Sequence, residues 1–138
     1  MPSKTEIEEE FYKNGKPKFY VEYIGNELQL HKEWNEDGVL LYDESLTKNI
    51  SNQVSERKIF YSNGEPMSYD QHKYQDVSGV NRIHRMIDKK WYENGILAQD
   101  IKLGSKSKYF NIEGEKINED EFKVIEDSGL FAYDLLCP

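Results

Sequence analysis

Apolar and polar residues alternate along most of this chain, and glycine-containing turns interrupt the alternation at five places. Four of the five turn glycines follow Asn or Asp, the dipeptides most typical of tight β-hairpins. We expect these turns to take type I′ geometry, in which both central residues have positive φ. The pattern therefore predicts five consecutive hairpins, with turns at Gly15, Gly38, Gly64, Gly95 and Gly114.

A large aromatic residue stands four positions before each turn glycine. These residues are Phe11, Trp34, Phe60, Trp91 and Phe110, and a second aromatic follows in three units as Tyr12, Tyr61 and Tyr92. A single hairpin cannot bury its aromatic residue, so neighbouring hairpins should stack edge to edge. We interpret the first row as a buried structural stripe along the sheet, and a ligand-binding platform is the alternative.

The residues that follow the turns alternate with a period of two. Behind Gly38, for example, Leu40, Tyr42 and Leu46 share one parity, which predicts that they lie on one face of a strand. The turn glycines are 23, 26, 31 and 19 residues apart by subtraction of their positions, a length that holds one hairpin and its connection but no helical crossover. We therefore predict a mainly β protein, an elongated antiparallel sheet of about five stacked hairpins.

Two segments interrupt this rhythm. Residues 47–57 are polar, and we expect them to form a long connection. Residues 70–88 are expected to be an insertion into the array. Within the insertion, Ile83, Met86 and Ile87 have helical spacing, whereas Ile83, Arg85 and Ile87 alternate as they would in a strand, and both conformations remain open.

The C-terminal residues have a different pattern. Asn118 followed by Glu121 forms a capping-box sequence, Phe122 and Ile125 have helical spacing, and Gly129 is a typical helix stop. We expect residues 1–117 to form the hairpin array and residues 118–138 to add a short helix and an apolar capping segment within the same domain. The role expected for that segment is to cover the last exposed strand edge.

The repeated motif aromatic-Tyr-x-Asn-Gly-x-Leu resembles the variant MORN repeat, and in particular the bacterial multi-repeat proteins regarded as antitoxins or immunity proteins. It is carried by residues 11–15, 60–64 and 91–97, with a looser copy at 34–38, and the resemblance covers about residues 8–117. The intervals are uneven, and Pro17 and Pro66 replace the Leu of the motif. The resemblance implies stacked hairpins and a role in neutralising a toxin.

Composition narrows the possible functions. The 138 residues suit one domain, and 26 acidic against 18 basic residues give a net charge of −8. This charge argues against direct binding of nucleic acid or an anionic membrane and suits a basic partner. The single cysteine, Cys137, excludes an internal disulfide, and the N-terminus lacks the apolar segment of a signal peptide. We expect a cytoplasmic protein.

Candidate chemistry is sparse. The three histidines, His31, His72 and His84, have no paired metal-ligand spacing, and no phosphate-binding loop or nucleophile motif occurs. We expect no catalytic residue, no metal and no cofactor. A lysine stands two positions before the aromatic in four units, as Lys32, Lys58, Lys89 and Lys108; it could contact an anionic ligand, or its stem could simply lie beside the ring.

The expected function is therefore a non-catalytic immunity or antitoxin protein that occludes the basic surface of a cognate bacterial toxin, one acting on nucleic acid. We expect it to be a monomer or a weak dimer. The alternative is a MORN-like scaffold that binds a protein or membrane partner. The residues expected to contact the partner are Trp34, Glu36, Asp37, Tyr42, Asp43, Glu44, Tyr92 and Glu93.

Overall fold

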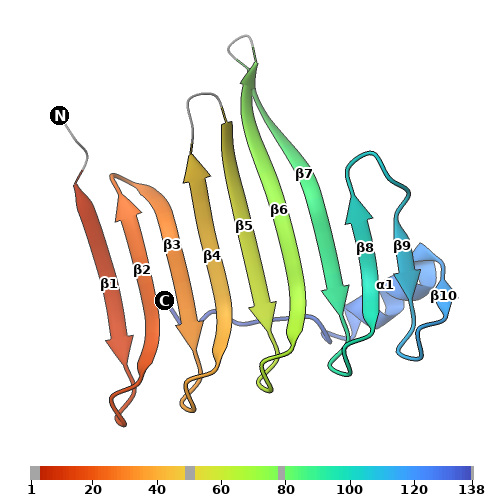
Figure 1. Ribbon diagram of the computed structural model, residues 1–138, viewed down its shortest axis with the longest axis horizontal. Helices are drawn as coiled ribbons and strands as arrows, with labels where there is room; N and C mark the ends of the chain where they lie inside the picture. Colours follow the sequence, from red (N-terminus) through yellow and green to blue (C-terminus); the bar gives the residue numbers. More distant parts are fainter. Residues whose placement is uncertain (1–3, 49–51, 78–79, 138) are drawn as a thin grey trace.

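The computed structural model describes residues 4–48, 52–77 and 80–137. Ten strands pair antiparallel in a single open sheet, in the same order as in the sequence (Figure 1). The strands are β1 (Thr5–Phe11), β2 (Pro17–Ile24), β3 (Glu27–Trp34), β4 (Leu40–Lys48), β5 (Asn52–Phe60), β6 (Pro66–Val77), β7 (Val80–Trp91), β8 (Leu97–Lys102), β9 (Lys108–Phe110) and β10 (Lys116–Ile117). One short helix, α1 (Glu119–Asp127), follows them. The predicted mainly β fold of stacked hairpins with a C-terminal helix is confirmed.

The five repeat turns all lie at the same end of the sheet, along its lower edge in Figure 1. Their glycines have φ between +86° and +89°. In the first turn the Gly15 amide donates to the Tyr12 carbonyl at 3.0 Å, and the Tyr12 amide donates to the Lys16 carbonyl at 2.9 Å. The loop therefore has three residues with the glycine last, and the expected two-residue type I′ geometry is wrong. The Asn14 side chain accounts for the difference, because its oxygen accepts from the Lys16 amide at 2.9 Å and stabilises the wider turn.

A β-bulge recurs in the first four repeat hairpins. In the second hairpin Glu33 pairs with Tyr42 but Trp34 pairs with Leu40, so one residue of β4 is extra. The extra residues are Lys18, Leu41, Met67 and Ala98. Because a bulge breaks the period of two, Leu40 and Tyr42 lie on opposite faces, and the face expected for them from parity is wrong.

The chain after α1 crosses one face of the sheet. We call residues 128–137 the strap, the face that it crosses the strap face, and the opposite face the open face. Figure 1 shows α1 and the strap on one side of the sheet only. The strap does not cover the last strand edge as expected, since its end is hydrogen-bonded to Glu33 on β3.

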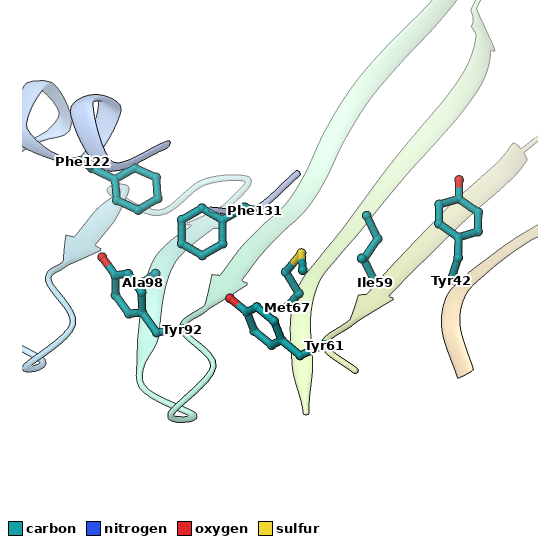
Figure 2. Close-up of a cluster of buried hydrophobic side chains, with 8 residues drawn as sticks. All are labelled: Tyr42, Ile59, Tyr61, Met67, Tyr92, Ala98, Phe122 and Phe131. Carbon is teal, nitrogen blue, oxygen red and sulfur yellow. The ribbon is translucent and has the colours of Figure 1, made fainter. Parts of the chain in front are cut away.

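The hydrophobic core lies between the strap face and the C-terminal residues. Figure 2 shows Phe122 of α1 and Phe131 of the strap beside Tyr92. The buried cluster contains Tyr42, Ile59, Tyr61, Met67, Tyr92, Ala98, Phe122 and Phe131. Of the tyrosines that follow the first aromatic row, Tyr61 and Tyr92 therefore lie in the core, whereas Tyr12 is half-buried.

The first aromatic row points to the other side. Phe11 is 55% exposed. The other members of the row are half-buried and so more accessible than the core residues; they are Trp34, Phe60, Trp91 and Phe110. The expectation that this row is the buried stripe is wrong, because the apolar side chains of α1 and the strap cover the opposite face.

The two interruptions are strand. Residues 47–57 largely extend β4 and β5, with residues 49–51 outside the described part, so the expected long connection is wrong over the remainder. Of residues 70–88, 78–79 lie outside the described part, and the others belong to β6 and β7, the longest strands. Ile83 lies in β7, which decides between the two open conformations in favour of strand. The expected C-terminal capping box is present, with Asn118 accepting from the Glu121 amide at 2.8 Å. No helix in the described residues is long and apolar enough to cross a membrane.

Candidate binding surfaces

Glu33 anchors the end of the strap. Its side chain is fully buried, and its carboxylate accepts from the amides of Leu136 and Cys137 at 2.8 and 3.0 Å and from the Tyr133 hydroxyl at 2.7 Å. His31 lies 2.7 Å away on the same strand. Desolvation by burial raises the pKa of Glu33, whereas the hydrogen bonds lower it. The hydrogen bonds together outweigh desolvation, so the pKa of the carboxyl lies below its ordinary value. The site is satisfied within the chain and serves to hold the strap.

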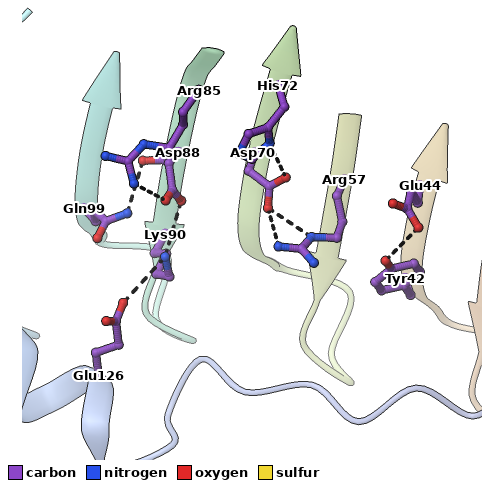
Figure 3. A network of polar contacts seen from close by, with 10 residues as sticks. All are labelled: Tyr42, Glu44, Arg57, Asp70, His72, Arg85, Asp88, Lys90, Gln99 and Glu126. Carbon is purple, nitrogen blue, oxygen red and sulfur yellow. Dashed lines mark hydrogen bonds and ion pairs between the residues drawn. The ribbon is translucent and has the colours of Figure 1, made fainter. Parts of the chain in front are cut away.

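A polar network occupies the strap face beside the strap (Figure 3). Arg57 donates twice to Asp70, at 2.8 and 3.0 Å, and His72 lies 3.6 Å from the same carboxyl group. The Tyr42 hydroxyl donates to Glu44 at 3.0 Å, and burial followed by the Glu44 charge raises the pKa of Tyr42. The Arg57–Asp70 pair joins β5 to β6, and the Tyr42–Glu44 pair lies within β4.

A second group of charges continues the network toward α1. Asp88 lies 3.6 Å from Arg85 and 3.3 Å from Lys90, and Lys90 lies 3.6 Å from Glu126 of α1. Each carboxylate in Figure 3 thus faces a hydrogen-bond donor or a base, an arrangement that suits structural support. Within the described part of the chain, no group of three His, Cys, Asp or Glu residues converges as metal ligands would.

The eight residues expected to bind a partner fall in three different places. Tyr42 and Tyr92 are only 5% and 2% exposed on the strap face, so the expectation that a partner contacts them is wrong for this folded form. Glu44 lies beside Tyr42 in the polar network. The other residues are accessible: Trp34 and Asp43 lie on the open face, and Glu36, Asp37 and Glu93 lie in the turns.

The turns form a continuous exposed edge that we call the turn rim. It consists of residues 13–16, 36–38, 62–65, 93–95 and 112–115, all of which are exposed. Six of these residues are acidic and two are basic. The acids are Glu36, Asp37, Glu65, Glu93, Glu113 and Glu115, and the bases are Lys13 and Lys16.

Hydrogen bonds join neighbouring turns of the rim. The Asn14 amide group donates to the Glu36 carbonyl at 2.9 Å, and Lys16 donates to the Asp37 carbonyl at 3.0 Å. The Asn94 amide group donates to the Ile112 carbonyl at 3.1 Å. These contacts restrict the relative positions of the acidic side chains before any partner binds.

The tyrosine of the motif, which follows the first aromatic residue, joins its hairpin to the next one. Tyr12, Tyr61 and Tyr92 each donate a hydroxyl hydrogen at 2.7 Å to the carbonyl of the first aromatic in the following unit. Those acceptors are Trp34, Trp91 and Phe110. This role was missed in the sequence, although the recurrence of Tyr in three units was the signal that could have indicated it.

The second hairpin has Asn35 in place of this tyrosine. The Asn35 oxygen accepts from the amides of Asp37 and Val39 in its own turn. The strap supplies an aromatic ring to the same hairpin, since Tyr133 stacks on Tyr42 with 5.5 Å between centroids. Tyr133 of the strap thus provides, in the second hairpin, an aromatic ring on the strap face where the motif tyrosine is absent.

The open face carries an apolar stripe and, beside it, a mixed row of polar residues. The stripe comprises Phe11, Pro17, Trp34, Leu40, Phe60, Pro66, Trp91, Leu97 and Phe110. The mixed row, in register from β2 to β9, is Tyr20, Lys32, Asp43, Lys58, Tyr69, Lys89, Asp100 and Lys108. The four lysines of this row therefore lie on the same face as the first aromatic row.

A shallow depression of about 200 Å³ lies in the middle of the open face. Phe60, Pro66, Tyr69 and Trp91 line it, together with Lys58. The Lys58 ammonium lies 5.9 Å from the Tyr69 ring centroid, and Lys89 lies 3.9 Å from Asp100. Lys58 and Lys89 therefore interact with a ring and an acid of their own sheet.

Comparison of the chain with protein-family models, with curated proteins and with solved structures finds no match in any of the three. The functional interpretation therefore depends on the residues and their geometry.

Proposed function

We propose that this protein is a non-catalytic immunity or antitoxin protein that neutralises a cognate bacterial toxin by covering its basic surface with the turn rim. The observation that supports this proposal is the set of six exposed acids on the turn rim, in which hydrogen bonds join the first turn to the second and the fourth turn to the fifth. Toxins that act on nucleic acid need basic surfaces, so an acidic rim would compete directly with their substrate.

Two physical effects favour such a rim. Acidic side chains attract a basic partner over a distance and accelerate its encounter with the protein. The turn-to-turn hydrogen bonds hold the backbone of the rim in place, so less conformational entropy is lost on binding. Glu36, Asp37 and Glu93 of the expected binding residues belong to this rim.

The proposal is tested by co-expression with the product of the neighbouring open reading frame, followed by co-purification. The wild-type chain should protect the cells and bind that product, whereas the triple variant Glu36→Gln, Asp37→Asn and Glu93→Gln should bind at least about tenfold more weakly. A matched control removes three acids from β1, as Glu6→Gln, Glu8→Gln and Glu9→Gln. Equal loss in both variants would show that net charge, rather than the rim, determines binding.

A MORN-like scaffold that binds a membrane or a protein is the second candidate. The observation that favours it is the alignment of Lys32, Lys58, Lys89 and Lys108 on the open face. Flotation with vesicles that contain anionic lipid at moderate salt tests it, because this protein of net charge −8 should float only if the lysine row binds the headgroups.

A further inference from the structure

We propose that the open face binds a second copy of this chain, with the two sheets packed face to face around a two-fold axis that runs parallel to the strands between β5 and β6. This proposal does not depend on the proposed toxin partner, which would use the turn rim.

The open face has the composition of a contact surface. Its apolar stripe has one apolar residue on each strand from β1 to β9; Phe11 is 55% exposed and the other residues are half-buried. Figure 1 shows no other element over this face in the described part of the chain. A continuous apolar stripe of this kind is more typical of an interface than of a solvated surface.

The charges of the mixed row favour a partner whose surface charge also alternates in sign. Lys32 and Lys58 both pair with Asp43, and Lys89 and Lys108 both pair with Asp100. Opposite charges therefore alternate along the row. A uniformly charged ligand would meet repulsion at every second or third position, whereas a surface with the same alternation, shifted by one strand, would meet attraction throughout.

A second copy rotated about the proposed axis provides that shift. Strand β5 then faces β6 of the second copy, β4 faces β7, and β3 faces β8. In the mixed row Lys58 faces Tyr69, Asp43 faces Lys89 and Lys32 faces Asp100. In the apolar stripe Phe60 faces Pro66, Leu40 faces Trp91 and Trp34 faces Leu97. Each charge meets an opposite charge or an aromatic ring, and each large ring meets a smaller apolar side chain.

An axis that runs along one of the central strands is unfavourable. An axis along β6 would place Lys58 against Lys89 and Asp43 against Asp100 of the second copy. An axis along β5 would place Lys32 against Lys89. Because like charges in contact are destabilising, the charge pattern favours an axis that runs between two strands. Among such axes, the one between β5 and β6 is the one about which all ten strands face a strand of the second copy, so it buries the largest area.

The available area indicates a dimer of modest affinity. Strands β3 to β8 at a spacing of about 4.8 Å, with three rows of side chains along them, present on the order of 600 Å² of projected face. A standard interface buries about 800 Å² of accessible surface from each partner. Two such sheets pack about 10 Å apart with their strands nearly aligned.

Zero-length carboxyl–amine cross-linking of the wild-type chain tests the axis directly. Within one sheet, Asp43 and Lys89 are three strands apart, about 14 Å, and Lys32 and Asp100 are five strands apart, so neither pair can be joined within one copy. We expect both cross-links in a dimer-sized species, together with a concentration-dependent shift from monomer to dimer in sedimentation velocity. A monomer at every concentration, a dimer that lacks these cross-links, or flotation with anionic vesicles in the absence of a dimer would overturn the proposal.

A charge-exchange cycle provides a second test. Asp43→Lys and Lys89→Asp should each raise the dimer dissociation constant at least about tenfold, because each repeats its like-charge contact twice across the axis. The double variant should recover most of the wild-type affinity, since it restores the pair with its signs exchanged. Glu36→Lys on the turn rim is the control and should leave dimerisation unchanged. If the double variant folds with a normal melting curve but stays monomeric, the proposed contact is wrong.

Discussion

The carboxylate of Glu33 accepts a hydrogen bond from the hydroxyl of Tyr133 at 2.7 Å, across 100 residues of chain. This contact joins the third strand of the sheet to the end of the strap. Because Glu33 also accepts from the two backbone amides of Leu136 and Cys137, one buried carboxylate determines where the strap ends. The strap in turn buries Tyr42 and Tyr92, so the core depends on this anchor.

Replacement of Glu33 by Gln should destabilise the protein by about 2–4 kcal/mol, because the amide nitrogen would face a donor and the charged hydrogen bonds would be lost. Urea unfolding followed by tryptophan fluorescence measures the change in the free energy of unfolding. Glu36→Gln on the exposed rim is the matched control and should change it by less than about 0.5 kcal/mol. Similar values for both variants would show that the anchor contributes little to stability.

The stability of the wild-type chain should fall in acid, in part through Glu33. Its folded-state pKa lies below the ordinary value of 4.5, so the folded state gains stability above pH 4.5 and loses this contribution as the pH falls toward the folded-state pKa. The Glu33→Gln variant cannot lose it, and its free energy of unfolding should therefore change less between about pH 5 and pH 3. Parallel curves for the two proteins in this range would contradict the assignment.

The core tyrosines should make the fold sensitive to alkali. Burial, followed by the nearby charge of Glu93, raises the pKa of Tyr61 from 10.0 to about 12. A folded-state pKa above the unfolded value stabilises the fold fully below pH 10, and this contribution is lost as the pH rises toward 12. Tyr61→Phe should flatten the decline in stability between about pH 10 and pH 12 in urea titrations.

Replacing the adjacent residues Trp91 and Tyr92 by Ala should change the free energy of unfolding by very different amounts. Tyr92→Ala removes a ring that is 2% exposed and packs against Phe131, and should cost about 3–5 kcal/mol. Trp91→Ala removes a half-buried ring from the open face and should cost about 1–2 kcal/mol under dilute, monomeric conditions. Thermal and urea unfolding compare the two variants. A larger cost for Trp91 would mean that the open face is the better-packed one.

Much of the sheet could be predicted because its signals are local. The Asn14-Gly15 turn and its relatives mark where each hairpin reverses, and the pair Asn118 and Glu121 marks where α1 begins. These preferences act through contacts within a few residues and therefore survive in any tertiary arrangement. The extension of β4 and β5 beyond residue 47, and of β6 and β7 beyond residue 70, was not predicted. The residues there are largely polar, so they lack the apolar alternation that indicates a strand, although their backbones pair with the neighbouring strands.

Among the candidate binding residues, solvent exposure could be predicted from the sequence only for those that lie in the hairpin turns. Glu36, Asp37 and Glu93 are accessible because turn residues project from the sheet. Tyr42 and Tyr92 were assigned to a partner surface although they are core residues, because the face covered by the strap is not encoded within either strand.

The sequence by itself determined the repeat, the hairpin turns, the antiparallel order of the strands and the start of the helix, because each arises from backbone preferences and pairing between neighbours along the chain. Only the tertiary structure decided which face became the core. That choice depends on two features that the alternation of the sequence does not encode. The recurrent bulges shift side chains such as Tyr42 to the strap face, and the buried carboxylate of Glu33 holds the strap there through contacts across 100 residues or more.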